Sequence, residues 1–336
     1  MDAGLALAVG LAIAFAVTNG LHDASNAIAT LVATRAARPS QAIVLASIFN
    51  LIGPFLLGGA VADTIGGIVT VSPSVATEVI GSGLAAAVSW NLITWSLGLP
   101  SSSGHALVGG LVGAAVVEGG TDAVNWGGLD GLHPSGVLGT LIALAVSPVL
   151  GGLAAFLLIR ALRRAARRAS RAWDTPTRAG QWTMSSALAF SHGANDAQKS
   201  VGVVAALLLA TGHIDSLNAP TWATFACAAA LTLGTAIGGW RIIRTVGRRI
   251  YRLQQIEALA SQTSSAGVIF GASLLGAPTS TTQVVASSVV GIGGGRRRWH
   301  HVNWSIVRQI GLAWLITIPV TIALGGGILV VWRWIT

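Results

Sequence analysis

The stretch SHGANDAQK at residues 191–199 decides the fold, because it places polar groups inside an apolar segment at 182–211. A second stretch, NGLHDASN at residues 19–26, matches it around a shared Asp inside the apolar segment at 3–33. A charged side chain at such a position costs at least ~2.5 kcal/mol by insertion scales, so each Asp requires a partner. The chain therefore carries two copies of one polar motif.

Outside these motifs the composition is that of a membrane protein. Of the 336 residues, 53% are hydrophobic and 9% are charged, and the mean hydropathy is +0.71. A soluble domain carries roughly 25% charged residues. Since unpaired backbone cannot face lipid, the apolar segments predict an all-α polytopic membrane protein in a lipid bilayer.

The net charge of +9 has its source in short Arg runs between apolar segments. This pattern fits a membrane face better than a nucleic-acid surface, so we expect no nucleic-acid partner. The positive-inside rule places these runs in the cytoplasm of a multi-pass cell-membrane protein. They lie at 35–38, 160–178, 241–252 and 296–298, and the acidic connections between them lie outside.

The apolar segments repeat in the same order in both halves. In the first half they are 3–33, 41–62, a pair at 79–98 and 104–117, and 136–160; in the second, 182–211, 220–241, a pair at 256–276 and 282–294, and 303–332. Each pair is flanked by one type of charge, which predicts a re-entrant helical hairpin. The count predicts two inverted-topology repeats, at 1–160 and 182–336, joined by a basic linker at 161–181.

A second motif is duplicated as well. LPSSSGH at 99–105 matches APTSTTQ at 277–283, and Pro148 corresponds to Pro319. Inverted repeats with short, Gly/Pro-interrupted segments indicate a secondary-transporter site near the membrane midplane. We therefore expect the long helix of each half to be broken, at Gly20 and at Gly193.

The first motif pair supplies oxygen ligands that suit a proton or a hard cation. The candidate coupling residues are His22, Asp23, Asn26, Asn195 and Asp196. The alternative is that each carboxylate only caps a broken helix or pairs with a structural neighbour. His22 could hold a proton near neutral pH or be a buried structural histidine.

The second motif pair combines hydroxyl groups with the start of a short helix, where free N–H groups bind oxyanions. The candidate anion-binding residues are Ser101, Ser102, Ser103, Thr279, Ser280, Thr281 and Thr282. Each run alone is typical of a simple N-cap, and the duplication favours the binding role. His105, Lys199 and Gln283 are secondary candidates.

These motifs resemble the inorganic phosphate transporter (PiT) family, also called the phosphate permease family, and its bacterial low-affinity branch. The resemblance rests on Gly193-Ala194-Asn195-Asp196 and on Pro278 to Thr282, with their first-half counterparts, and covers nearly the whole chain. It implies symport of inorganic phosphate with protons or sodium, the anion held by both tips and the cations by both Asp motifs. It implies no enzyme activity, no cofactor and no resident metal.

Two departures from the family pattern bear on the coupling ion and on the substrate. His22 replaces the Asn of the family motif, a variant of proton-coupled or metal-phosphate members, so we expect proton coupling and transport of phosphate free or as a metal-phosphate complex. Gln283 replaces a His and loses a titratable group. The alternatives are a sodium-coupled symporter, a sulfate or other oxyanion transporter, and an anion channel.

A different class of protein also fits some of these residues. A membrane metalloenzyme would use His22, Asp23, His105, His192 and Asp196 as ligands. An enzyme does not need an inverted duplication, which favours the transporter. The sequence leaves the oligomeric state open, and a homo-oligomer is compatible with it.

Overall fold

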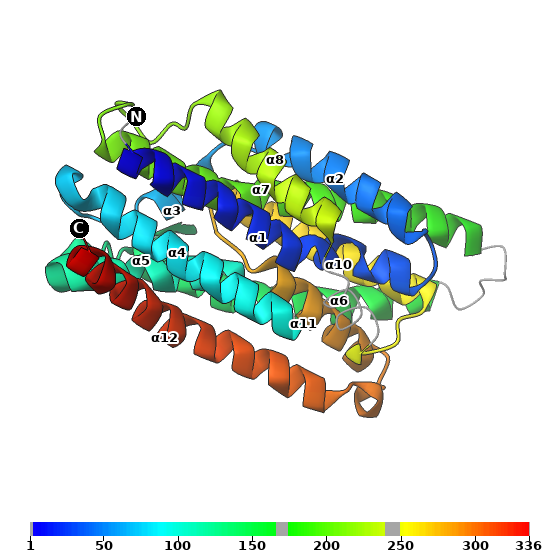
Figure 1. Ribbon diagram of the computed structural model, residues 1–336. Helices are drawn as coiled ribbons and strands as arrows, with labels where there is room; N and C mark the ends of the chain where they lie inside the picture. Colours follow the sequence, from blue (N-terminus) through cyan, green and yellow to red (C-terminus); the bar gives the residue numbers. More distant parts are fainter. Residues whose placement is uncertain (1–2, 166–173, 239–248, 336) are drawn as a thin grey trace.

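The computed structural model describes residues 3–165, 174–238 and 249–335, which form a bundle of helices with one small hairpin of strands (Figure 1). The first half holds α1 (Ala3–Ala33), α2 (Pro39–Leu56), α3 (Ala60–Gly66), α4 (Pro73–Leu97), α5 (Ser103–Gly119), η1 (Gly120–Ala123), the antiparallel strands β1 (Gly128–Asp130) and β2 (His133–Ser135), and α6 (Gly136–Ala165). The second half holds α7 (Asp174–Ala210), α8 (Thr221–Ile237), α10 (Gln255–Leu274), α11 (Thr281–Gly295), η5 (Trp299–His301) and α12 (Trp304–Ile335).

The predicted all-α membrane architecture is confirmed. Within the described ranges, five helical stretches are long and apolar enough to cross a membrane: α1, α2, α5 together with η1, α6 and α12. The division at 161–181 stays a prediction. The first residues of this linker continue α6 and its last ones begin α7, while residues 166–173 lie outside the described part of the chain. Residues 241–248 of the predicted loop at 241–252 lie outside it as well.

Helices of the two halves pack in corresponding pairs. α1 packs on α8 and α7 packs on α2, while α5 packs on α12 and α11 packs on α6. α1 also contacts α4 as α7 contacts α10, and α1 and α7 contact each other. Exchanging the halves therefore reproduces the packing pattern, as a two-fold relation between two repeats requires.

Ion pairs join the two ends of each predicted hairpin. In the second, Glu257 at the start of α10 lies 3.0 Å from Arg296, just after α11. In the first, Arg333 of α12 contacts both Glu78, near the start of α4, and Glu118, near the end of α5. Each hairpin therefore begins and ends at the same end of the bundle, the first at the end opposite to the second, and both helical hairpins are present.

Charge separates along the bundle. The basic last turn of α6 and the Arg-rich turns after α1 and α11 lie at one end, which we call the Arg-rich end, and the acidic ends of α4 and α5 lie at the other (Figure 1). Arg178 of α7 donates a hydrogen bond to the Arg35 carbonyl at 3.1 Å, which ties two of these basic segments together. The apolar length of the helices therefore lies between two charged faces, as a membrane requires.

The predicted break at Gly20 and Gly193 is wrong, because α1 and α7 run through both positions without interruption. The glycines serve close helix packing instead. A Cβ on Gly20 would lie 2.1 Å from the Leu231 carbonyl oxygen of α8, and one on Gly193 would lie 2.3 Å from the Asn50 carbonyl oxygen of α2. A continuous helix also satisfies its own backbone in lipid.

The structure has a break elsewhere, between α2 and α3, where the sequence predicts one segment at 41–62. Gly58 adopts φ +73°, a conformation that favours glycine. Gln198 of α7 satisfies the interrupted backbone: its Oε1 accepts from Val61 N at 3.1 Å and its Nε2 donates to the Gly58 carbonyl. Gln198, which belongs to the motif at 191–199, thus stabilises the break between the neighbouring helices α2 and α3.

We expect Gly20→Ala to lower the melting temperature of the purified protein, because the new methyl group would force α1 and α8 apart at a cost of about 1–3 kcal/mol. Gly10→Ala is the matched control, since Gly10 lies on the same helix and its Cβ would meet nothing within 4 Å. That variant should keep or slightly raise the melting temperature. Equal melting curves for both variants would contradict the packing role.

Candidate functional site

The two motif carboxylates meet at the contact between α1 and α7. Asp23 is 3% exposed and Asp196 is fully buried. One ligand atom each of Asp23, Asp196 and His192 lie within 4.8 Å of one another. Two residues 173 positions apart in the sequence therefore form one buried polar cluster.

Both hairpin tips contact Asp23; we call residues 101–103 the first tip and residues 279–282 the second tip. Ser103 Oγ lies 3.1 Å from Asp23 Oδ2, and Thr282 Oγ1 donates to Asp23 Oδ1. Asn26 Nδ2 lies 2.8 Å from Asp23 Oδ1 and 2.9 Å from Thr282 Oγ1. The carboxylate thus joins α1 to the tips of both halves.

Asp196 lies among cationic and hydroxyl partners. Lys199 Nζ donates to Asp196 Oδ1 and, at 2.5 Å, to the Thr279 carbonyl of the second tip. Thr281 Oγ1 donates to Asp196 Oδ2 at 3.1 Å, and His192 Nε2 lies 3.0 Å from that oxygen. Lys199 is only 1% exposed, so its ammonium is a buried cation.

The same ammonium lies beside the first tip. A Cβ on Gly104, the residue that follows the first tip, would lie 3.6 Å from Lys199 Nζ. Lys199 therefore lies between the two tips. Sequence reasoning names it only as a secondary candidate, and the structure puts it at the centre of the site.

Asn195 anchors the second tip. Its Nδ2 donates to Ser273 Oγ at 3.0 Å and to the Ala277 carbonyl at 3.1 Å, while its Oδ1 accepts from Thr279 N at 3.0 Å and from Thr279 Oγ1 at 3.2 Å. Both donors and both acceptor positions of the amide are thereby used. The geometry favours a positioning role for Asn195 over contact with a cation.

His22 lies at the corresponding place in the first motif and is linked to the first tip through the hydroxyl of Thr94. Its Nε2 lies 2.9 Å from Thr94 Oγ1, which lies 2.9 Å from Ser101 Oγ. His22 therefore faces a hydroxyl chain that leads to the tip.

Ser102 and Ser280 cap the short helices in the same way. Ser102 Oγ accepts from His105 N at 3.3 Å, and Ser280 Oγ accepts from Gln283 N at 3.4 Å. The hydroxyls of Ser102 and Ser280 are therefore N-caps, as the alternative interpretation of each run predicts. His105 also places its Nδ1 2.6 Å from Ser102 Oγ.

The caps leave part of each helix start unused. The N–H groups of the first two residues of α5 and of α11, at 103–104 and 281–282, have no acceptor within the described ranges. Free N–H groups at a helix start attract anions. Two such starts approach one carboxylate-lined cluster.

Several polar residues of the site escape sequence reasoning. Asn19 Oδ1 accepts from Ser103 Oγ at 2.7 Å, and Asn50 Oδ1 lies 3.0 Å from His192 Nδ1. Thr94 connects His22 to Ser101 of the first tip, and Ser273 accepts a hydrogen bond from Asn195. The one signal for Asn50 is that it is a lone amide in an apolar segment.

The proposed metalloenzyme ligands do not come together as a set. In the described part of the chain, only Asp23, His192 and Asp196 form a group with metal-binding spacing. His22 and His105 hydrogen-bond to hydroxyl groups, at Thr94 and Ser102. The five residues therefore do not form one metal site.

Known transporters are similar to this chain over nearly its whole length. The pattern of the phosphate transporter family matches residues 19–325. A probable low-affinity inorganic phosphate transporter of Rhizobium meliloti is 40% identical over 328 residues, which cover 95% of each chain. A protein with the same description from Bacillus subtilis is 38% identical over 324 residues, which cover 95% of this chain and 94% of that protein.

A solved structure has the same fold. It is described as "The sodium-dependent phosphate transporter" and is 26% identical, with a TM-score of 0.86 over the whole length of both chains. These similar proteins are transporters and not enzymes. The similarity spans both halves of the chain and therefore both motif pairs.

Proposed function

This chain belongs to the phosphate transporter family, and from that premise we propose that it is a secondary active symporter that moves inorganic phosphate together with protons. As a member of a transporter family it is a multi-pass membrane protein and not an enzyme. The orientation that we propose has the Arg-rich end in the cytoplasm, as the positive-inside rule favours. We further propose two inverted halves that alternate access to one site.

One observation carries the coupling part of the proposal, namely the charge of the buried cluster. Two carboxylates, Asp23 and Asp196, and one ammonium, Lys199, leave one net negative charge away from water when the histidines are neutral. Adding a phosphate anion to this charge inside a membrane is costly unless cations enter with it. Symport of a cation with phosphate removes that cost.

The anion would be held by the two tips. The free N–H groups at 103–104 and 281–282 offer donors from both halves. The hydroxyls of Ser103, Thr281 and Thr282, which donate to Asn19, Asp196 and Asp23 in this structure, would turn to the anion when it binds. Lys199 adds a positive charge between the tips. Helix starts and hydroxyls together can bind an oxyanion without arginine.

The coupling ion has two candidates. His22, which replaces the family Asn and faces the hydroxyl chain to the first tip, supports protons. The description of the solved neighbour supports sodium, which the oxygens of Asp23 and Asp196 would suit. We place protons first because the residue that differs from the family pattern lies beside Asp23.

Uptake by purified protein in lipid vesicles tests the substrate. We expect saturable uptake of labelled phosphate that arsenate inhibits more strongly than sulfate does. Repeating the assay with and without a divalent cation and a chelator separates free phosphate from a metal-phosphate complex. Stronger inhibition by sulfate than by unlabelled phosphate would contradict phosphate as the substrate.

Thr282 gives a sharp test of the tip. We expect Thr282→Val, which keeps the shape but removes the hydroxyl that donates to Asp23, to lower phosphate uptake about 10- to 100-fold, the value of a hydrogen bond to a charged group. Thr282→Ser keeps the hydroxyl and should retain most uptake. If the Val and Ser variants transport equally, the hydroxyl has no role in transport.

A further inference from the structure

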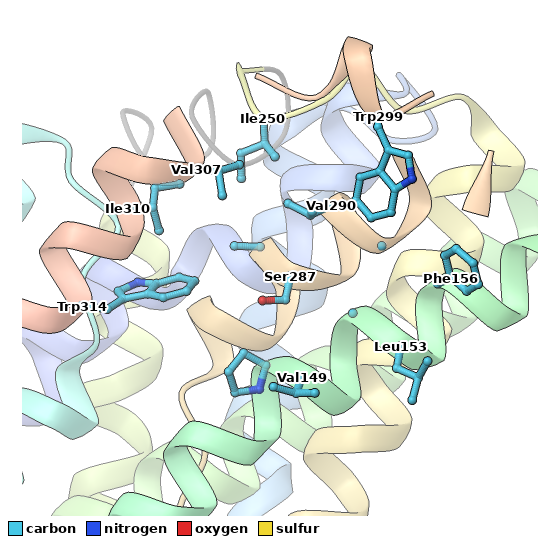
Figure 2. A pocket seen from close by; sticks show the side chains of 14 residues that line it. Val149, Leu153, Phe156, Ile250, Ser287, Val290, Trp299, Val307, Ile310 and Trp314 are labelled. Atoms are coloured by element: carbon cyan, nitrogen blue, oxygen red, sulfur yellow. The ribbon is translucent and has the colours of Figure 1, made fainter. Parts of the chain in front are cut away.

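Two neighbouring cavities lie at the Arg-rich end of the bundle. The first is a groove of about 430 Å³ between α6, α11 and α12. Figure 2 shows Leu153 and Phe156 of α6 on one side, Val307 and Trp314 of α12 on the other, and Ser287 of α11 between them. Apart from Ser287, the groove is lined by aliphatic and aromatic side chains and glycine.

The groove opens on the face of the bundle that meets lipid. Val149 and Leu153, which line it, are 66% and 52% exposed on α6, one of the helices long enough to cross a membrane. An exposed apolar groove at this place is accessible to acyl chains.

The second cavity, of about 540 Å³, is cationic. It is lined by the side chains of Arg160, Arg163, Arg164 and Arg297, with Ala161 and Gly295. Among the side chains that the structure describes, which do not include that of Asp174, no carboxylate lies within 4.0 Å of any of these four guanidinium groups. Arg296, by contrast, pairs with Glu257. The cavity thus holds four positive charges without a counter-ion among the described side chains.

The two cavities adjoin each other along α6 and α11. Phe156 lines the groove, and Arg160, one turn further along α6, places its guanidinium 5.3 Å from the centre of the Phe156 ring while lining the cationic cavity. On α11, Gly291 lines the groove and Gly295, again one turn later, lines the cationic cavity. An apolar surface therefore passes directly into a cationic one.

The backbone presents Arg297 in an unusual conformation. It adopts φ +55°, with Arg297 N bonded to the Gly294 carbonyl at 2.8 Å and Arg298 N bonded to the Gly293 carbonyl at 2.9 Å. Glycine is the usual residue at this place of such a helix end. Here an arginine occupies it and adds its charge to the cavity.

We propose that this joined surface is a binding site for an anionic phospholipid. An acyl chain lies in the groove, and the phosphate of the headgroup is bound by the arginines, which suit phosphate geometrically. Basic pockets between membrane helices bind anionic headgroups in this way. A free anion would not use the groove, and a zwitterionic lipid would bring no net negative charge to the four arginines, whereas an anionic lipid brings at least one.

The site contacts the transport machinery. Trp314, a groove residue, donates a hydrogen bond from Nε1 to the carbonyl of Pro100, next to the first tip, at 3.0 Å. A bound acyl chain would therefore touch a side chain that holds that tip.

Direct lipid binding to the full-length protein in detergent tests the proposal, by titration with fluorescent phosphatidylglycerol and phosphatidylcholine. We expect phosphatidylglycerol to bind at least tenfold more tightly. Arg160→Gln combined with Arg297→Gln should weaken that binding about thirtyfold, since each cation near an anionic surface contributes about fivefold. Arg35→Gln combined with Arg38→Gln removes the same charge away from the groove and should change binding by less than about twofold.

A second pair of variants tests the groove. Val290→Trp fills it and should weaken phosphatidylglycerol binding at least tenfold, whereas Val44→Trp, on the exposed face of α2, should not. Equal binding of both lipids, equal loss in the two arginine pairs, or no loss with Val290→Trp would each overturn the proposal. So would displacement of the lipid by millimolar inorganic phosphate, because the arginines would then bind a free anion. Binding is measured directly, so the result is independent of transport activity.

Discussion

Replacing Asp23 by Asn is expected to lower phosphate uptake by the reconstituted protein about 100-fold or more. The change removes the negative charge that balances the coupling cation and weakens the hydrogen bonds from Ser103 and Thr282. Hydrogen bonds to a charged group contribute about 1.5–3 kcal/mol each, and both tips depend on this one carboxylate. Initial uptake rates in vesicles, at equal protein content, measure the effect.

Asp63→Asn is the matched control for this variant. It makes the same chemical change at an exposed carboxylate of α3, away from the cluster, and should leave uptake unchanged. The Asp23 variant should also elute from size-exclusion chromatography as the unchanged protein does, which separates loss of function from loss of fold. Uptake near the unchanged level by a folded Asp23→Asn protein would remove Asp23 from the proposed coupling site.

The second large effect is expected at the pair Asp196 and Lys199. Asp196→Asn leaves the Lys199 ammonium buried without its counter-charge, which should destabilise the protein by about 3–5 kcal/mol. Adding Lys199→Met removes the uncompensated charge and should restore most of the thermal stability. Melting temperatures of the single and double variants in detergent measure this.

Phosphate uptake should not recover together with stability when both Asp196 and Lys199 are replaced. The double variant lacks both the carboxylate and the cation between the tips, so we expect it to fold and still not take up phosphate. A stable Asp196→Asn single variant would show that the two charges are not strongly coupled. Recovery of uptake in the double variant would show that neither charge takes part in transport.

The architecture could be predicted from the sequence because hydropathy and charge act locally. The apolar segment predicted at 3–33 is α1, and the hairpin arm predicted at 282–294 is within one residue of α11. The start of α4 differs more, at Pro73 rather than 79, because its first turns carry polar residues and Glu78. A hydropathy pattern cannot include polar turns that tertiary contacts stabilise.

Other features depend on contacts between distant segments. The motif glycines predict a break only if no neighbouring helix is considered; with α8 and α2 present, they allow close packing. Likewise, Asp23 and Asp196 stand out as charges in apolar segments, but Asn50 and Thr94 gain their roles only through side chains 142 and 72 positions away. The central position of Lys199 follows from the meeting of both tips, which no local pattern contains.

Accumulation of labelled phosphate in vesicles under separately imposed ion gradients tests the central claim most directly. With an inward proton gradient and no sodium, we predict that phosphate accumulates above its external concentration, and that collapsing the gradient with a protonophore releases it. An inward sodium gradient at equal pH on both sides should give little accumulation. Accumulation with sodium alone would contradict proton coupling, and entry that only reaches the external concentration under both gradients would contradict symport itself.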